Sequence, residues 1–268
     1  MANAGKELVR EPTPSELNNN VPVTVRIPAG PFWMGSDPDD STAHDNEKPR
    51  LTVDLPDYQI GRYPITNAQY ARFLAAKPSH STPYSNERGN ESYNWNRGTR
   101  TYPKGKANHP LVLVNLHDAM AYCGWLSEVT GQIYRLPTEE EWEKAARGGL
   151  PSVRRYPWGD EWQPGICNTQ ELERNGTTSI HEFEQTTSPF GAVGMAGHVW
   201  EWTVSGYGPY SGSQYKSHSF IGIILCVVRG GSWRNSKQEA RVSCRGRYQF
   251  VVRRSDLGFR IVCDGDSK

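Results

Sequence analysis

The strongest constraint on how this chain folds is residues 229–262, near its C-terminal end. The segment begins with RGGSW at residues 229–233, where paired glycines permit backbone conformations that other residues avoid. It ends with LGFRIV at residues 257–262, where apolar residues alternate around Arg260 as in a β-strand. Residues 234–256 between these ends show no periodic pattern. The segment is therefore predicted to be a long irregular excursion between two buried anchors.

The charge of this segment is unlike that of the rest of the chain. Residues 229–260 hold nine Lys and Arg against two acidic residues, a net charge of +7 in a chain whose total is +1. The remaining residues therefore carry about −6. The arginines can pin an irregular loop by donating to backbone carbonyls, or they can be displayed as a binding surface on a rigid scaffold. Both interpretations stay open, and different arginines can serve different purposes.

Composition limits the class of protein. The 268 residues, with 26 Gly, 9 Trp and a mean hydropathy of −0.71, predict a large core under a loop-rich surface. No apolar stretch approaches the roughly 18 residues of a membrane-spanning helix; the best candidate, residues 220–228, indicates a buried strand. The first residues lack the pattern of a secretory signal, so a cytoplasmic location is expected, with surface display left open. Five cysteines at wide spacings indicate neither a disulfide framework nor a zinc site.

The chain begins with a segment of low apolar content. Residues 1–20 are predicted to be a flexible leader, and the domain extends over residues 21–268. Residues 21–27 alternate as a strand and residues 32–35 return after a turn, which predicts a hairpin. Residues 77–108 show no periodicity and are expected to form a long surface loop, either functional or packed as cover for the core.

Helix signals occur at a few places. Thr66 with Gln69, and Thr138 with Glu141, form capping boxes that predict helix starts. Residues 117–131 carry apolar residues at helical spacing up to Gly131. Few helices and many irregular segments are therefore expected.

Seven ordered motifs resemble the formylglycine-generating-enzyme (sulfatase-modifying factor) domain. They occupy residues 27–35, 63–70, 134–148, 156–159, 197–202, 229–233 and 258–260. The resemblance runs from about residue 22 to residue 263, nearly the whole chain. It implies an α+β fold of the C-type-lectin-like kind, loop-rich, with few helices and short antiparallel strands.

The resemblance does not extend to the catalytic residues. The enzymes of the family hold copper(I) with two cysteines that follow the Gly-Gly-Ser-aromatic motif, whereas residues 234–240 contain none and Cys244 stands alone. The related sulfoxide synthases use a His-x3-His-x-Glu iron motif, and none of the seven histidines has that spacing. The chain is therefore expected not to be an enzyme.

Calcium is the cofactor that the resemblance implies, in a structural role. The family has a calcium site at the motif that here spans residues 194–201, although Gly194 stands where an Asn is usual. Oxygen donors would come from the side chain of Glu201, from backbone carbonyls of Gly197 and Val199, and from Asn168 at the family's other calcium position. No other cofactor is expected.

The C-terminal segment is also similar to the variable region of proteins targeted by diversity-generating retroelements. That resemblance makes residues 229–262 the variable, ligand-binding region. It places the diversified, ligand-binding positions at Arg234, Asn235, Ser236, Cys244, Gly246, Tyr248, Val252, Arg254, Ser255 and Asp256. It places the scaffold at Gly230, Gly231, Ser232, Trp233, Arg241, Arg245, Gly258, Phe259 and Arg260.

These observations favour a non-catalytic ligand-binding protein that displays residues 234–256. A partner module of the same family and an oxidase of formylglycine-generating type are the alternatives. Residues 250–252 beside Tyr248, Arg234 and Arg254 would form an apolar patch with cationic edges, which suits a protein or peptide ligand with an acidic component. A net charge of +1 argues against nucleic acid, since no broad basic face is available. A monomer without membrane contact is expected.

Overall fold

The computed structural model describes residues 21–216 and 224–264. The predicted leader, residues 1–20, and residues 220–223 of the predicted buried strand lie outside the described residues. The described part of that strand is β7, Leu225–Arg229.

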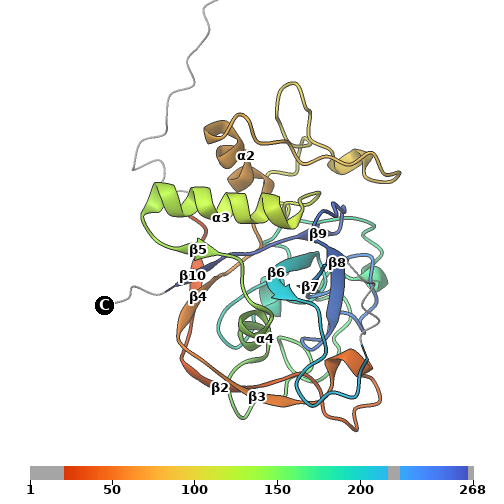
Figure 1. Ribbon diagram of the computed structural model, residues 1–268. Helices are drawn as coiled ribbons and strands as arrows, with labels where there is room; N and C mark the ends of the chain where they lie inside the picture. The colour runs from red at the N-terminus through yellow and green to blue at the C-terminus, as the bar shows by residue number, and fades with distance from the viewer. Residues whose placement is uncertain (1–20, 217–223, 265–268) are drawn as a thin grey trace, which may run out of the picture.

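The strands of the described residues form three sheets (Figure 1). The first has the order β1-β4-β10-β5, with antiparallel neighbours: Thr24–Ile27, Tyr58–Gly61, Val262–Asp264 and Tyr134–Arg135. The second pairs β2 with β3: Gly30–Met34 and Leu51–Leu55. The third has the order β8-β7-β6-β9, in which only the β6 and β9 pair is parallel: Arg245–Gln249, Leu225–Arg229, Trp200–Gly206 and Leu257–Gly258.

The described residues form three α-helices and four single 3-10 turns. The α-helices are α2, Asn67–Ala76; α3, Leu116–Thr130; and α4, Glu139–Arg147. The 3-10 turns are η1, Asp45–Glu47; η2, Glu91–Tyr93; η3, Gln170–Leu172; and η4, Glu184–Thr186. The predicted capping boxes are confirmed at Thr66 and Thr138. A third box, Asn115 with Asp118, opens α3, and Gly131 ends it at φ +75°.

The predicted hairpin at residues 21–35 is wrong. β1 pairs with β4, and β2 pairs with β3 in a different sheet. Gly30, at φ +122°, lies where the chain passes from one sheet to the other. A hairpin prediction assumes that consecutive strands pair, whereas here each finds a partner farther along the chain.

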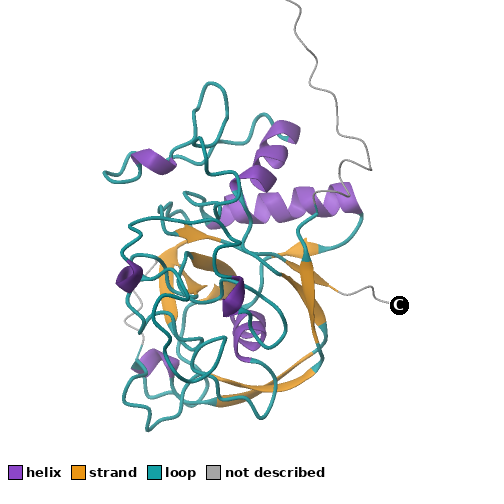
Figure 2. Ribbon diagram, turned by 180° about the vertical axis from the view of Figure 1, so that it is seen from behind, coloured by secondary structure: helices purple, strands orange, loops and turns teal. Residues whose placement is uncertain are grey.

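The core has two main parts. In the larger one, α2 and α3 pack over the third sheet, and the rings of Tyr122 and Phe259 meet with centroids 5.6 Å apart. In the other, Trp142 of α4 is surrounded by residues of β4 and β10. Figure 1 shows α4 in the middle of the molecule, and Figure 2 shows irregular loops over the opposite side. α4 is therefore a central element against which later segments pack.

The predicted fold class, α+β with few helices, short strands and many loops, is confirmed. No helix in residues 21–216 or 224–264 combines the length and apolar character needed to cross a membrane.

Candidate ligand-binding surface

Buried ion pairs lie beneath the C-terminal segment. Among its described residues, four arginines are at most 6% exposed and each meets a buried carboxylate. The pairs, which we call the ionic layer, are Arg229 with Glu143, Arg241 with Glu47, Arg245 with Glu139, and Arg260 with Glu201. Both oxygens of a carboxylate are often engaged; Arg241 reaches those of Glu47 at 2.5 and 2.8 Å. These arginines therefore fix the segment and are not available to a ligand.

α4 supplies two carboxylates of the ionic layer. Glu139 and Glu143 are four residues apart, which places them on the same face of the helix. Arg245 donates to Glu139 at 2.6 and 2.9 Å. Arg229 pairs with Glu143 and also donates to three successive carbonyls of residues 242–244 at 2.7 to 2.8 Å. An irregular stretch of backbone is thereby held by a helix far away in the sequence.

The electrostatics of the ionic layer favour the charged forms. Burial alone would raise the pKa of the Glu47 carboxyl, but hydrogen bonding and charge from Arg241, with a hydrogen bond from Ser243 Oγ at 2.7 Å, hold this pKa below its usual value. A carboxylate this buried is stable only when paired, because an unpaired buried charge is costly.

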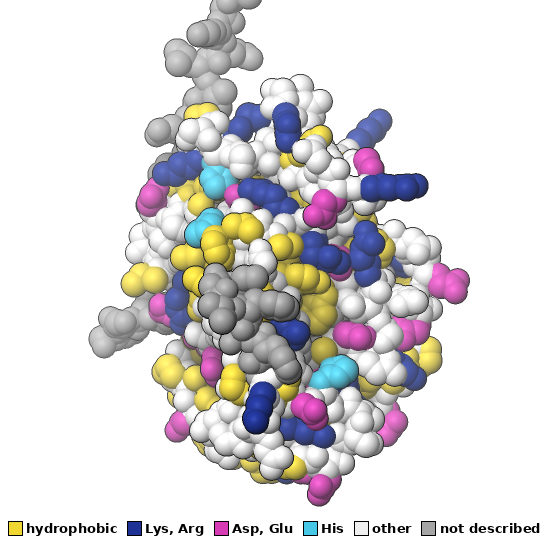
Figure 3. All heavy atoms as spheres, turned by 45° about the vertical axis from the view of Figure 1, so that its right-hand side comes forward, with side chains coloured by type: hydrophobic (Ala, Val, Ile, Leu, Met, Phe, Trp, Pro, Cys, Tyr) yellow, Lys and Arg dark blue, Asp and Glu magenta, His cyan; other side chains and the backbone are white. Residues whose placement is uncertain are grey.

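The outer side of the same segment is exposed or half-exposed. We call this set the display face: Arg234, Asn235, Arg247, Tyr248, Gln249, Phe250, Val251, Val252 and Arg254. Figure 3 shows the side of the molecule on which β8 lies, with apolar side chains near its centre and Lys and Arg side chains around them.

The cationic part of the display face is ordered by aromatic rings. The guanidinium of Arg234 lies over Trp233 at 4.3 Å, and that of Arg254 over Tyr248 at 5.0 Å. Arg234 also donates to Ser255 Oγ at 3.0 Å. Planar cations and rings held in this way are rigid contacts for a ligand.

The apolar part lies at one end of the β7 and β8 pair. Leu225 is opposite Gln249 in the register, so Ile224 and Val251 lie at the same end, with 65% and 52% exposed area. Phe250 is half-buried, and its ring meets His117 at 5.2 Å. The apolar patch predicted at residues 250–252 thus has an exposed centre, Val251, with Phe250 anchored below it.

Several predicted ligand-binding positions need correction. Cys244 is 2% exposed, as are Ser255 and Asp256, so they cannot touch a ligand. Gly246 has no room for a side chain, since a Cβ there would lie 2.7 Å from Val228 Cγ2. Strand alternation explains the last case: Gly246 is on the side of β8 that packs against Val228 and Trp200, the side it shares with the half-buried Tyr248, whereas Arg247 is on the opposite side.

The other predicted ligand-binding residues have these places. Asn235 accepts from Trp200 Nε1 at 2.9 Å, which fixes it at the rim. Ser236 is half-exposed and donates to Glu239 at 2.7 Å. Val252 is half-exposed beside Val251. Arg247, Gln249 and the exposed Ile224 were missed; alternation places Arg247 and Gln249 on the same side of β8 as the buried Arg245, so it could not have separated them from it.

The predicted scaffold residues lie inward of this face. Gly230, Gly231, Ser232, Arg241, Arg245, Gly258, Phe259 and Arg260 are buried, and Trp233 is half-buried. Ser232 Oγ bonds to Asp256 Oδ2 at 3.0 Å, which ties the two ends of the segment together.

The cysteines present no exposed thiol. All five are buried, and burial raises the pKa of Cys123, Cys167 and Cys244 to about 12. Cys226 is opposite Tyr248, four residues along β8 from Cys244, a separation of roughly 13 Å at strand spacing. Cys226 and Cys244 therefore cannot hold one copper ion together.

The residues named for calcium do not form one donor set. Asn168 and Gly197 are adjacent, because a Cβ on Gly197 would lie 2.5 Å from Asn168 O, and Asn168 Oδ1 is buried with no hydrogen-bond partner among the described residues. Glu201 as a ligand is wrong: Arg260 reaches its two oxygens at 2.6 and 2.8 Å and Trp142 Nε1 donates at 2.6 Å. Without Glu201 as a neighbouring donor, nothing in the structure favours the carbonyl of Val199 as a ligand. Calcium binding stays a prediction.

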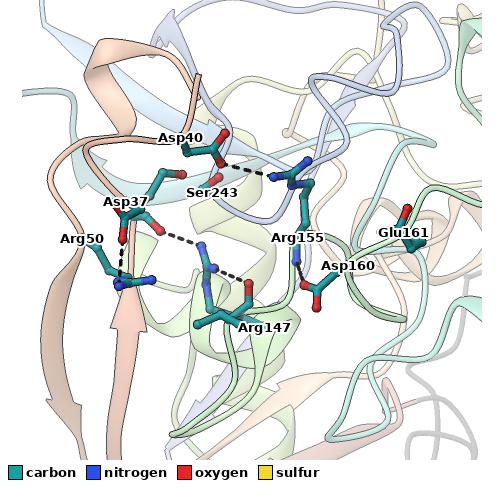
Figure 4. Close-up of a pocket in the computed structure, with 11 residues that line it drawn as sticks. Asp37, Asp40, Arg50, Arg147, Arg155, Asp160, Glu161 and Ser243 are labelled. Carbon is teal, nitrogen blue, oxygen red and sulfur yellow. Dashed lines mark hydrogen bonds and ion pairs between the residues drawn. The ribbon is translucent and has the colours of Figure 1, made fainter. Parts of the chain in front are cut away.

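A charged pocket of about 280 Å³ has Ser243 of the C-terminal segment in its lining (Figure 4). Two of its arginines form ion pairs with neighbouring carboxylates: Arg50 with Asp37 at 2.9 Å, and Arg155 with Asp40 at 3.6 Å. Because positive and negative groups alternate around it, this pocket does not select a ligand of one sign.

Comparison with known proteins gives consistent relatives. The model of the sulfatase-modifying factor enzyme 1-like domain matches residues 9–265. The formylglycine-generating enzyme of Streptomyces coelicolor is 31% identical over 96% of this chain and 94% of its own. An inactive Cα-formylglycine-generating enzyme 2 of Mus musculus is 29% identical over 89% of this chain and 85% of its own. Other relatives are longer: the chain spans 64% of a hercynine oxygenase from Mycolicibacterium smegmatis.

Solved structures agree on the fold. PvdO from Pseudomonas aeruginosa superposes with a TM-score of 0.74 and 26% identity, covering 91% of this chain and 95% of its own. The variable protein 1 of Treponema denticola superposes with a TM-score of 0.67 and 21% identity, covering 90% and 94%. The fold is thus the C-type-lectin-like α+β fold of formylglycine-generating type.

Proposed function

Because the chain belongs to the sulfatase-modifying factor enzyme 1-like family, which has active and inactive members, we propose that it is a non-catalytic ligand-binding protein. Its ligand contacts the display face.

One observation carries this proposal: the segment that exposes the cations and apolar groups of the display face is also fixed to the core by the buried ion pairs of the ionic layer. Arg245 is buried on Glu139, whereas Arg247, two residues later, is exposed. A surface fixed in advance in this way loses little conformational entropy on binding. Outward residues can also change without disturbing the buried pairs.

This separation supports the more specific proposal that the chain is a target protein of a diversity-generating retroelement. The likeness in fold to a variable protein of Treponema denticola is in line with it. A near-identical template repeat beside a reverse-transcriptase gene in the source DNA is the expected genetic context. Its absence would leave a ligand-binding protein with a fixed sequence.

The ligand is a protein or peptide with acidic groups. The display face combines Arg234, Arg247 and Arg254 with the exposed Val251, and arginine together with apolar groups is typical of protein-binding hot spots. A screen against immobilised proteins, glycans and DNA at two salt concentrations tests this. Protein binding is expected, without the steep salt dependence of phosphate contacts.

Matched variants identify the binding surface. The variant Arg234→Ala, Arg247→Ala, Val251→Ala should lose binding. The control, Arg26→Ala, Arg72→Ala, Val23→Ala, removes the same kinds of exposed side chain elsewhere and should retain it. Equal binding by both variants, or tight DNA binding, would contradict the proposal.

The alternative function is oxidation of a peptide cysteine, which the similarity to the Streptomyces coelicolor enzyme favours. We expect no formylglycine in a peptide assay with copper(I) and oxygen, because all five thiols are buried and Cys226 lies far from Cys244. Mass spectrometry of a cysteine peptide measures this directly. Copper-dependent formylglycine would overturn the non-catalytic assignment.

A further inference from the structure

A second cavity, of about 430 Å³, lies under the long loop at residues 77–108. It is lined by Ser79, His80, Ser81, Thr82, Tyr84, Arg97, Arg100 and Arg253. Seven of these lining residues belong to the loop, and Arg253 comes from the C-terminal segment. Its volume is within the range of small-molecule sites.

The lining is cationic and rich in donors. It has three arginines and four hydroxyl groups but no carboxylate. Asp118, which lies behind the lining, pairs with Arg253 at 2.6 Å and with His80 at 3.1 Å. The cavity therefore keeps about two uncompensated positive charges, unlike the balanced pocket of Figure 4.

Each arginine is held in position by a different part of the fold. Arg100 donates to the carbonyls of His80 and Leu74 at 3.0 and 3.1 Å, at the end of α2. Arg253 donates to Leu113 O at 3.0 Å. Arg97 lies over the ring of Tyr84 at 3.6 Å and has no ion-pair partner in the described part of the chain.

We propose that this cavity binds a small tetrahedral oxyanion, a phosphate or sulfate group carried on a larger molecule. Fixed guanidinium groups and hydroxyls match such oxygens, and arginine binds them in bidentate fashion. The cavity has the volume of roughly fourteen waters at about 30 Å³ each, so it has room for the group to which the oxyanion is attached. The proposal is independent of the display face.

Titration calorimetry at low ionic strength, with inorganic phosphate, inorganic sulfate and O-phosphoserine as probes, tests the proposal. Saturable binding with a Kd of about 1 mM or tighter is expected for at least one probe. Tighter binding of O-phosphoserine than of phosphate would identify an ester as the source. No saturable binding of any probe would overturn the proposal.

Two variants locate the site. Arg97→Gln should weaken binding about ten- to hundredfold, the loss of a charged hydrogen bond. Arg88→Gln, an exposed arginine of the same loop outside the cavity, should have no effect. Equal weakening by both variants would indicate non-specific charge attraction and reject the site. The display variant Arg234→Ala, Arg247→Ala, Val251→Ala should bind the probe normally, which separates this test from that of the proposed function.

Discussion

Arg245 and Arg247 are two residues apart on β8 but have different environments. The first is 6% exposed and bound to Glu139, and the second is exposed with its guanidinium 4.8 Å from the ring of Tyr207. The sequence allowed every arginine of this segment to be either a pin or a ligand contact. For the buried arginines the answer depends on distant carboxylates, from 59 residues away for Arg260 and Glu201 to 194 for Arg241 and Glu47, and spacing along the chain carries no information about them.

The two arginines give a matched stability test. Arg245→Met should lower the free energy of unfolding by about 1.5–3 kcal/mol, because Glu139 would lose its two short charged hydrogen bonds and keep only Arg229, at 3.4 Å, and Tyr210. Arg247→Met should change it by no more than about 0.5 kcal/mol, as at most surface sites. Urea unfolding at neutral pH measures both. Similar losses would mean that the ionic layer is not structural.

His198 predicts a pH effect. Burial lowers the pKa of this imidazole to about 4, although its hydrogen bond with Thr178 O at 3.0 Å opposes the shift. In the unfolded chain the imidazole of His198 takes up a proton near pH 6.5, whereas in the folded protein it stays neutral down to about pH 4. The contribution of neutral His198 to the free energy of unfolding is therefore complete above pH 6.5 and is lost as the pH falls toward 4.

The predicted loss from pH 7 to pH 4.5 is about 2–3 kcal/mol from this residue alone. In the variant His198→Asn, the new residue tolerates the φ of +69° and does not titrate in this range. The drop in its free energy of unfolding between pH 7 and pH 4.5 should therefore be smaller than that of the parent by about 2–3 kcal/mol. Urea unfolding of both proteins at the two pH values tests it. Parallel pH profiles would contradict the assignment.

At the scale of elements, local signals predicted helices better than strands. Each capping box, the one at Thr66 and the one at Thr138, spans only four residues of sequence. A helix begins at each of them. The pairing of β1 with β4 joins residues that are more than thirty positions apart, so the hairpin prediction failed. The alternation within β8 was in the sequence and would have corrected Gly246.

The turn after β7 provides a test at this scale. Gly231 and Gly212 share a φ of +73°, but a Cβ at Gly231 would lie 2.7 Å from Glu239 O, whereas a Cβ at Gly212 would meet no atom within 4 Å. Alanine at either site pays a backbone cost of about 1 kcal/mol, and only Gly231→Ala adds a backbone clash. Gly231→Ala should therefore be the less stable variant by thermal unfolding. Equal melting temperatures would show that the turn can move.

At the scale of the molecule, the motifs were sufficient to predict the fold. They are largely buried turns and packing residues, such as those around Trp202 and Phe259, so they report the scaffold directly. The site was predicted only in part, because exposure depends on how distant segments cover one another. Cys244 and Ser255 lie within the variable segment yet inside the protein, and the oxyanion cavity joins Arg253 to a loop that lacks any motif.

The central claim is that one segment combines a fixed inner layer with a replaceable outer face. Two libraries test it most directly: one randomises Arg234, Arg247, Gln249 and Val251, and the other randomises Arg229, Arg241, Arg245 and Arg260. Protease resistance of cell-displayed members measures the fraction that folds. Most members of the first library should remain folded, and most members of the second should be cleaved. Equal folded fractions in the two libraries would contradict the claim.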